Sequence, residues 1–275
     1  MLSMTTDYAT DRGCPEPALR RIAEAGFTHV HWCHHWSTDF VYHPSEITRI
    51  AAWLDELGLG VTDLHASAGQ EKRWTSPAEH ERLAGVELVK NRIEMVAALG
   101  SDVIILHTGS EPEDAAEKAA FWRQLRRSLD ALEPAARQSG VRIAVENGEF
   151  DLIDKLFESY GRDYLGLCYD AGHGNLRPDG LDRLAMLKRR LLSIHLHDND
   201  GNKDQHNLPF TGTVDWPRLA GVLAASSYAK WVNLEATMRN SEIDDEEEFL
   251  ARAFEGATRF ARMIAEARSA GGGRR

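Results

Sequence analysis

Histidine and carboxylate residues recur at the ends of short apolar segments throughout this chain of 275 residues. These residues are His31, His65, His107, Glu146, Asp170, His195 with His197, and Glu235. An apolar segment has no structural need to end so often in a side chain that can bind a metal ion. The repetition therefore predicts one polar site built from many segments, rather than a set of unrelated structural residues.

Four of these residues are the strongest candidates for metal binding. They are Glu146 in IAVENG, Asp170 in LCYDAGH, His195 in SIHLHDND and Glu235 in VNLEAT. Carboxylates combined with one imidazole suit a hard or borderline divalent ion, with Mn²⁺ as our first choice and Mg²⁺, Co²⁺ or Zn²⁺ as alternatives. Neighbouring carboxylates without a cation would repel one another and raise their pKa values, and a bound cation removes that cost.

The segments that carry these residues are predicted to be the strands of one barrel. Their predicted bounds are Leu2–Thr5, Thr28–Trp32, Gly60–His65, Val103–His107, Arg142–Glu146, Leu165–Asp170, Leu192–His197 and Trp231–Glu235. Each is followed by a segment that can form a helix, which is typical of parallel β/α units. We therefore predict an α/β fold, with a single (β/α)8 TIM barrel over residues 1–268 and a flexible C-terminal tail at 269–275. Active sites of such barrels lie at the carboxyl ends of the strands.

Glycines and apolar spacing mark the helices between the strands. Four helices are expected to end at glycines that can adopt the positive φ of a C-cap, namely Gly26, Gly58, Gly100 and Gly140. The third helix has a predicted inward face made of Leu83, Val86, Val89, Ile93, Val96 and Ala97. An open doubly wound sheet would also alternate strands and helices, but the segment at the first strand is TTDYATDRG, which is no glycine-rich phosphate loop. The barrel is favoured.

Composition and charge disfavour several classes of protein. The chain is 43% hydrophobic, enough for one sizeable core, and its net charge of −11 disfavours binding to phosphate backbones or anionic lipid. No run approaches the length of a membrane span, and the start lacks the regions of a signal peptide. Three cysteines without a CxxC pair are typical of reduced thiols. We expect a cytoplasmic protein with a small-molecule substrate, without nucleic acid or membrane as partner, and leave homo-oligomerisation open.

The motifs LHAS, ILHTG, VENG, DAGH, HLHDNDG, DQH and NLEAT resemble those of the xylose isomerase-like barrel superfamily. This superfamily contains sugar isomerases and epimerases, inosose dehydratase-like lyases and apurinic endonucleases of the endonuclease IV type. The resemblance implies that Glu146, Asp170, His195 and Glu235 bind one metal ion and that His173 faces the substrate. It also implies that Glu146 and Glu235 exchange protons on opposite faces of a carbon next to a carbonyl, through an enediolate intermediate.

The resemblance leaves several functions open. A divalent-metal-dependent sugar isomerase or epimerase is our first interpretation, because carboxylates above and below a carbon can remove and return its proton. A lyase or dehydratase acting on a keto-sugar or keto-inositol shares that first proton transfer. Its leaving group would be protonated by one of the histidines His65, His107, His173 and His206. A non-catalytic sugar-binding subunit is a further alternative.

A multinuclear zinc phosphodiesterase of the endonuclease IV type is another alternative. By resemblance, the ligands of three ions would be His65, His107 and Glu146, then Glu146, Asp170, His195 and Glu235, and finally His173, Asp204 and His206. Two segments disfavour this function, because NGEF follows strand Arg142–Glu146 where the endonucleases carry a small, glycine-rich stretch, and NLPFTGTVDW departs from their Gly-Glu-Gly pattern. The loops also lack the basic patch beside an apolar wedge that DNA kinking requires.

Two loops contain candidates for substrate binding. The segment HWCHHWSTDF includes His31 and Trp36, which can bond hydroxyl groups or stack on sugar C–H surfaces, although aromatics packed at the barrel mouth would give the same pattern. The segment GQEKRWTS offers Lys72 and Trp74, with a solvated loop as the alternative, and His197 completes the set. No glycine-rich phosphate nest follows the last two strands. We therefore expect an unphosphorylated sugar, polyol or keto-sugar.

Overall fold

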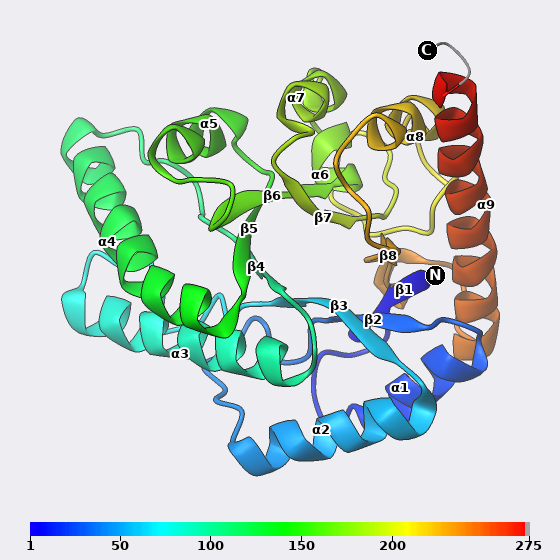
Figure 1. Cartoon of the computed structure of the whole chain (residues 1–275), viewed down its shortest axis with the longest axis horizontal. Coiled ribbons are helices and arrows are strands. Elements are labelled where there is room, and N and C mark those ends of the chain that lie inside the picture. The colour runs from blue at the N-terminus through cyan, green and yellow to red at the C-terminus, as the bar shows by residue number, and fades with distance from the viewer. Residues whose placement is uncertain (273–275) are drawn as a thin grey trace.

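The eight predicted strands are all present in the computed structural model, which describes residues 1–272, and they pair in parallel (Figure 1). They are β1 (Leu2–Thr5), β2 (His29–Trp32), β3 (Gly60–His65), β4 (Val103–Leu106), β5 (Arg142–Glu146), β6 (Leu165–Asp170), β7 (Leu191–His195) and β8 (Val232–Leu234). Their order in the sheet is β7-β6-β5-β4-β3-β2-β1-β8. A single bridge between Leu196 and Leu234 joins the two ends, where the Leu196 amide donates to the Asn233 carbonyl at 3.0 Å. The sheet is thus a nearly closed barrel, which confirms the predicted (β/α)8 fold.

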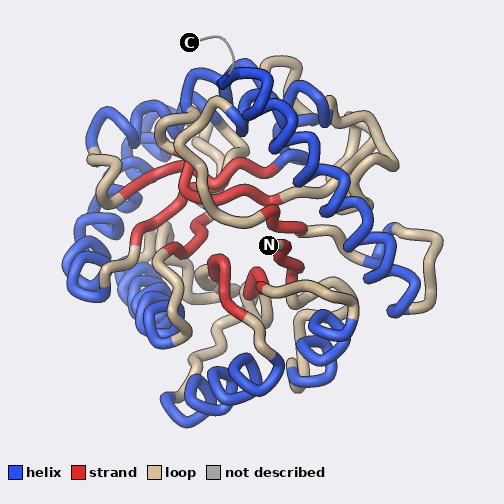
Figure 2. Tube along the Cα trace, turned by 45° about the vertical axis from the view of Figure 1, so that its right-hand side comes forward, coloured by secondary structure: helices blue, strands red, loops and turns tan. Residues whose placement is uncertain are grey.

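Helices follow every strand and surround the barrel, as Figure 2 shows for the described part of the chain. They are α1 (Glu16–Glu24), α2 (Pro44–Leu57), α3 (Glu79–Ala98), α4 (Ala115–Ser139), α5 (Phe150–Ser159), α6 (Ala171–Asn175), α7 (Gly180–Leu187), α8 (Trp216–Ala224), the 3₁₀ turn η1 (Met238–Asn240) and α9 (Glu246–Gly272). Gly58 and Gly140 end α2 and α4 with φ of 66° and 67°, in the left-handed conformation that was predicted for them.

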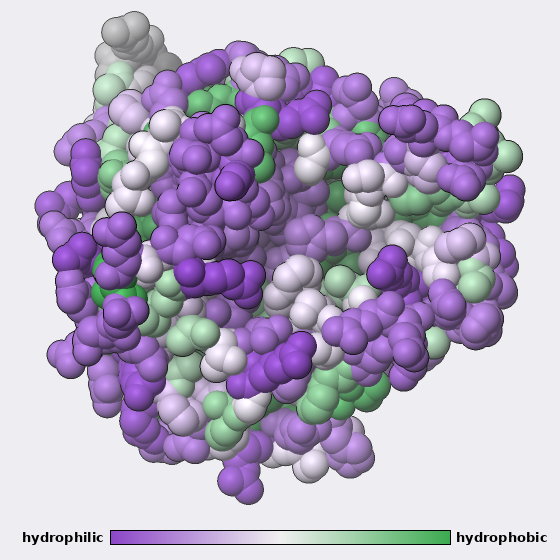
Figure 3. Space-filling model, turned by 180° about the vertical axis from the view of Figure 1, so that it is seen from behind, coloured by the Kyte–Doolittle hydropathy of each residue, from purple (hydrophilic) through white to green (hydrophobic). Residues whose placement is uncertain are grey.

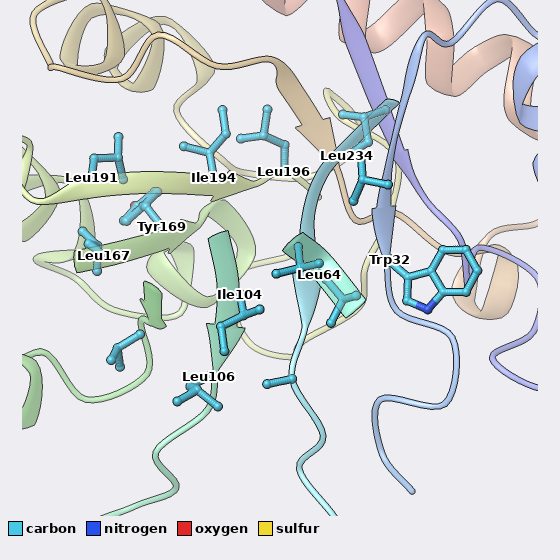
Figure 4. Close-up of a cluster of buried hydrophobic side chains, with 14 of the residues drawn as sticks. Trp32, Leu64, Ile104, Leu106, Leu167, Tyr169, Leu191, Ile194, Leu196 and Leu234 are labelled. Carbon is cyan, nitrogen blue, oxygen red and sulfur yellow. The ribbon is translucent and has the colours of Figure 1, made fainter. Parts of the chain in front are cut away.

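Apolar and polar residues alternate along the strands, and this alternation separates the core from the site. Leu64, Ile194 and Leu196 belong to the main hydrophobic core (Figure 4). The residues next to them in the strands point into the barrel interior. Ser193 on β7 hydrogen-bonds Asp63 on β3 across this interior, although the two strands are not adjacent in the sheet. Successive side chains of a strand face opposite sides, so the barrel interior receives the polar residues.

The last helix extends into the segment that was predicted to be a flexible tail. Residues 269–272 continue α9, since SAGG follows a run rich in alanine, arginine and glutamate that favours helix. The remainder of the predicted tail, residues 273–275, lies outside the described residues. Within residues 1–272, no helix is long and apolar enough to cross a membrane. The face in Figure 3 is covered mainly by hydrophilic residues, with small groups of hydrophobic ones scattered over it.

Candidate active site

A pocket of about 660 Å³ opens at the carboxyl ends of the strands. The predicted site residues that line it are Trp36, His65, His107, Glu146, His173, Asp204, His206 and Glu235. The remaining lining comes largely from the loops after β1 and β8, which contribute Asp7, Tyr8, Thr10, Asp11, Thr237, Arg239 and Asn240. The pocket therefore combines a floor of metal-ligand residue types with a rim of hydrogen-bonding side chains.

Glu146, His195 and Glu235 meet at the floor of the pocket. His195 Nδ1 lies 3.3 Å from Glu146 Oε2 and 3.1 Å from Glu235 Oε2. The three residues stand at the ends of β5, β7 and β8, and their exposed fractions are 4%, 0% and 6%. Because water reaches these groups poorly, their charges interact strongly with one another and with any bound ion.

Asp170 is held beside this group by its own backbone and by a neighbouring asparagine. Its amide donates to Asn147 Oδ1 at 2.6 Å, and Asn147 Nδ2 donates back to the Asp170 carbonyl at 3.1 Å. Its Oδ1 accepts from the His173 amide at 2.6 Å, capping α6, and lies 3.0 Å from His197 Nε2. The other carboxylate oxygen, Oδ2, has no hydrogen-bond partner among residues 1–272.

The four predicted metal ligands share one feature that fits a cation. Among residues 1–272, each has a buried atom without a hydrogen-bond partner, and these atoms are Glu146 Oε2, Asp170 Oδ2, His195 Nδ1 and Glu235 Oε2. His195 Nδ1 lies within ion-pair distance of Glu146 and Glu235, but neither contact has the geometry of a hydrogen bond. Burying a polar atom without a partner is costly, and a divalent cation held by carboxylate oxygens and one imidazole nitrogen would remove that cost.

Two further groups of the predicted ligands also come together. The rings of His65 and His107 stack with centroids 4.9 Å apart, and their Nε2 atoms lie 3.5 and 3.6 Å from Glu146 Oε2. Asp204 Oδ2 lies 3.2 Å from His173 Nε2 and 3.3 Å from His206 Nε2. Each of the three ligand sets that the resemblance implied therefore has members that line this pocket, while His195 and Asp170 contact lining residues from outside it.

Charges in the site shift several pKa values in opposite directions. Burial by itself would raise the pKa of Glu146, but His107 and His195 outweigh it and hold that pKa well below the usual range. Burial would lower the pKa of His173, yet Asp170 and Asp204 dominate and raise it to about 12. Without a bound cation, the site therefore contains the ionised carboxylate of Glu146 next to a protonated His173.

The residues predicted to bind substrate do not all lie in the pocket. Trp36 lines the pocket, with its ring tilted over His65 at a centroid distance of 5.1 Å. His31 and His197 are completely buried below the pocket, where His31 contacts Asp63 and His197 contacts Asp170. Both belong to the polar interior of the barrel, because their side chains share a face with neighbouring ligands.

Lys72 and Trp74 are not brought to the pocket. Lys72 is exposed and lines a separate surface hollow with residues of α3. Trp74 is 2% exposed and packs in the hydrophobic core, and its carbonyl accepts from Ser128 of α4 at 2.6 Å. The loop after β3 therefore folds back onto α3 and α4. Neither Lys72 nor Trp74 lies in the pocket lining, where a substrate contact was predicted for both.

Asp63 and Cys33 are parts of the site that the sequence reasoning missed. Asp63 Oδ1 lies 2.5 Å from His31 Nδ1, and Cys33 Sγ lies 2.8 Å from His31 Nε2. Asp63 carried a readable signal, because it is an acid two residues before His65 and must face the same side of strand β3. Arg239 and Asn240 at the rim follow the last strand in a loop whose course no sequence pattern indicates.

Comparisons with known proteins place the chain in a family. A family model described as xylose isomerase-like TIM barrel matches residues 19–254, so the chain belongs to this family. The uncharacterized protein y4fM of Sinorhizobium fredii (strain NBRC 101917 / NGR234) is 34% identical over 282 residues, covering 91% of this chain and 90% of that protein. A probable endonuclease 4 of Mycobacterium leprae (strain Br4923) is 24% identical over 151 residues, covering 49% of this chain and 58% of that protein.

Two solved structures illustrate the similarity of this chain to proteins of known structure. A D-tagatose 3-epimerase-like protein superposes with a TM-score of 0.77 at 18% identity, covering 97% of this chain and 99% of that one. The IOLI protein, solved with a binding zinc atom, superposes with a TM-score of 0.74 at 14% identity, covering 97% of this chain and 98% of that one. At such identities the likeness establishes the barrel fold.

Proposed function

We propose that this chain is a divalent-cation-dependent isomerase or epimerase of a small sugar, which moves a proton at a carbon next to a carbonyl. One observation carries the proposal. Glu146 and Glu235 line a pocket large enough for a monosaccharide, His195 Nδ1 lies 3.3 and 3.1 Å from their carboxylates, and Asp170 Oδ1 lies 3.7 Å from the lining residue His173. Each of these four residues, Glu146, Glu235, His195 and Asp170, has a buried atom without a hydrogen-bond partner among residues 1–272. The resemblance in fold to a D-tagatose 3-epimerase-like protein and to the IOLI protein supports it.

Glu146 and Glu235 are the proposed proton carriers. They stand at the ends of β5 and β8, and both line the pocket. Burial would raise the pKa of Glu235, but His195 outweighs it and keeps that pKa well below the usual range, so both side chains are ionised in the cation-free site. A carboxylate on each face of a substrate carbon can remove the proton on one side and return it on the other.

Glu146, Asp170, His195 and Glu235 would hold the cation, with Mn²⁺ as our first choice. A bound divalent ion supplies Lewis-acid stabilisation of the negative charge that develops on the substrate oxygens. His173, which lies 3.2 Å from Glu146 Oε1, is placed to exchange a proton with that carboxylate or with a substrate hydroxyl. The cytoplasmic location and an association into homo-oligomers stay predictions.

Trp36 and the rim are proposed to recognise a polyhydroxy compound. The indole ring can stack on the C–H face of a sugar, while Asp7, Asp11 and Asn240 can bond its hydroxyl groups. Among the described lining residues, Arg239 is the one Lys or Arg side chain. An acidic pocket of this kind favours an unphosphorylated sugar, polyol or keto-sugar over a phosphate ester.

Two other activities remain as candidates with specific support. A lyase acting on a keto-sugar or keto-inositol is favoured by His173 and His206, which lie on either side of Asp204 and can protonate a departing hydroxyl. A multinuclear phosphodiesterase is favoured by the assembly of three ligand groups around one pocket. The net charge of −11 and a described pocket lining with Arg239 as its one Lys or Arg residue speak against a DNA substrate.

Solvent-deuterium exchange tests the proposal. The full-length protein is loaded with Mn²⁺ in deuterated buffer and incubated with a panel of ketoses and keto-inositols, and proton loss next to the carbonyl is followed by NMR. We expect exchange together with interconversion of two isomers, and no exchange after the cation is removed with chelator. Exchange accompanied by loss of water would move the assignment to a lyase. Cleavage of abasic-site DNA without exchange on any sugar would overturn the proposal.

A further inference from the structure

A second group of donor atoms includes His65 and Glu235 of the pocket lining and extends to two buried residues outside that lining, Cys33 and His31. It consists of Cys33 Sγ, His31 Nε2, His65 Nε2 and one oxygen of Glu235, and these four atoms all lie within 4.8 Å of one another. Each of the four side chains is buried, with exposed fractions of 1%, 0%, 2% and 6% in that order. This set of four residues, called the Cys33 donor group below, differs from the set assigned to the proposed reaction because it contains a soft sulfur ligand.

The course of strand β2 brings Cys33 and His31 together. The two residues are two positions apart, so both side chains point into the barrel. Trp32 between them points the opposite way into the core, where its Nε1 donates to the Tyr42 hydroxyl at 3.1 Å. The Cys33 amide donates to Thr6 Oγ1 at 3.0 Å, which fixes the backbone just after the strand. The pair is therefore held rigidly below the pocket.

Asp63 orients the His31 ring for ligand binding. Its Oδ1 lies 2.5 Å from His31 Nδ1, while Asn233 Nδ2 donates to both Asp63 oxygens at 3.2 and 3.3 Å. A carboxylate beside Nδ1 favours a proton on that nitrogen, which would leave the Nε2 lone pair for an ion once the ring is neutral. His31 Nε2 lies 2.8 Å from Cys33 Sγ and 3.5 Å from Glu235 Oε1. Carboxylate–histidine pairs of this kind support ligand histidines in metal sites.

The distances between atoms of the Cys33 donor group can be compared with those around a tetrahedral ion. Glu235 Oε1 lies 3.2 Å from His65 Nε2 and 3.8 Å from Cys33 Sγ. With Zn–S of about 2.3 Å and Zn–N or Zn–O of about 2.0–2.2 Å, neighbouring ligands of tetrahedral zinc lie about 3.3–3.6 Å apart. Closing the group around an ion thus requires Cys33 Sγ and His31 Nε2, which are 2.8 Å apart, to separate by about 0.7–0.8 Å.

We propose that Cys33, His31, His65 and Glu235 bind a zinc ion, separate from the cation of the proposed reaction. A thiolate with two imidazoles selects zinc over the hard ions that an all-oxygen site prefers. The thiol gives up its proton as the ion binds. Glu235 Oε2 faces His195 and its Oε1 faces the Cys33 donor group. Zinc on Oε1 would therefore occupy the oxygen that the proposed proton transfer needs, so Glu235 would serve one of the two roles at a time. The site does not depend on the proton transfer proposed above.

Cobalt binding tests the site with a readout other than activity. The full-length protein is stripped with chelator and titrated with Co²⁺, whose bond to a thiolate gives a charge-transfer absorption in the near ultraviolet. We expect this absorption in the wild type and in the exposed-thiol control Cys14→Ser, and its complete loss in Cys33→Ser. Zinc titration should show one tight equivalent fewer in Cys33→Ser, while the uptake of Mn²⁺ stays as in the wild type.

Two further variants keep the test independent of any folding defect in Cys33→Ser. His31→Gln retains the thiol but should lose the tight zinc equivalent, and Asp63→Asn should weaken zinc binding about 10- to 100-fold. Circular dichroism confirms the fold of each variant. The proposal is overturned if cobalt binds the wild type without the charge-transfer absorption, or if the absorption persists in Cys33→Ser. It is equally overturned if only Cys168→Ser removes the absorption, because Cys168 lies in a different donor group with Glu146 and His195.

Discussion

His195 Nδ1 lies 3.1 Å from Glu235 Oε2, so an imidazole from β7 and a carboxylate from β8 share one buried position at the floor of the pocket. The same nitrogen lies 3.3 Å from Glu146 Oε2. Because the closing bridge of the barrel joins these two strands at Leu196 and Leu234, the contact depends on closure of the whole sheet. The site is therefore a product of the fold and not of any local motif.

Removal of this imidazole should empty the cation site. We expect His195→Ala, purified without chelator, to lose nearly all of the divalent metal that elemental analysis finds in the wild type. The loss of affinity should exceed the about 10- to 100-fold typical of a supporting residue, since a ligand itself is removed. His80→Ala, on the exposed surface of α3, is the matched control and should keep full metal content. Equal metal content in both variants would contradict the assignment.

Truncation of Trp36 should weaken substrate binding more than turnover. Loss of an aromatic contact of about 0.5–1.5 kcal/mol corresponds to a rise in KM of about 2- to 10-fold for Trp36→Ala, with a smaller change in kcat. Steady-state kinetics on the sugar identified by deuterium exchange measures this. Trp53→Ala provides the control, because Trp53 lies on α2 and lines a different hollow. A fall in kcat with unchanged KM would argue against stacking on the substrate.

Gly172 should be intolerant of a side chain, unlike the nearby Gly148. A Cβ at Gly172 would lie 1.9 Å from His197 Cε1, and His197 Nε2 is 3.0 Å from Asp170 Oδ1. Gly172→Ala should therefore displace His197, lower the free energy of unfolding by about 1–3 kcal/mol and weaken cation binding. A Cβ at Gly148 meets nothing within 4 Å, so Gly148→Ala should change stability by less than about 0.5 kcal/mol. Urea unfolding and metal titration distinguish the two, and similar behaviour of both variants would refute the packing argument.

Asp102 should stabilise the opposite end of the barrel in a pH-dependent way. Burial would raise the pKa of this carboxyl, but its ion pairs with Lys230 and Arg142 outweigh burial and lower it. A depressed carboxyl pKa gives stability that is present above the unfolded value of 3.8 and is lost as the pH falls through the folded value. Because the group is partly exposed, Asp102→Asn should cost only about 0.2–1 kcal/mol at neutral pH.

Urea unfolding of the wild type and Asp102→Asn across pH 7 to pH 3 measures this contribution. The difference between the two proteins should be constant near neutrality and shrink below pH 3.8. Metal content should be the same in both proteins, because Asp102 lies at the amino-terminal ends of the strands. A difference that grows as the pH falls would show that the carboxyl is not stabilised by its cationic partners.

The barrel fold could be predicted from the alternation of apolar strands with helical segments. Strand ends bearing Glu146, Asp170, His195 and Glu235 can be found in the sequence because the carboxyl ends of parallel strands must meet at one face. The prediction extended less well to loops, whose course depends on contacts distant in sequence. Trp74, for example, is fixed in the core by Ser128, more than fifty residues later.

Helix α3 shows the same limit within a regular element. Leu83 was predicted to face the core and is 50% exposed, so this part of the prediction is wrong, while Val86, Val89, Ile93 and Val96 are buried as predicted. The neighbouring Arg82 is 3% exposed instead, because its guanidinium donates to Glu79 and to Ser128 Oγ on α4. Apolar spacing cannot reveal a buried arginine whose partner stands on another helix.

The most direct test of the account is solvent-deuterium exchange by Glu146→Gln and Glu235→Gln, each started separately from the two isomers of the substrate. Each carboxylate should serve one face of the reacting carbon. Each variant is therefore predicted to lose exchange from one isomer, to retain it from the other, and to slow interconversion by at least about 100-fold. Metal content is measured on the same samples, and Glu149→Gln is the control glutamate. Interconversion at the wild-type rate in either variant, with its cation in place, would contradict the account.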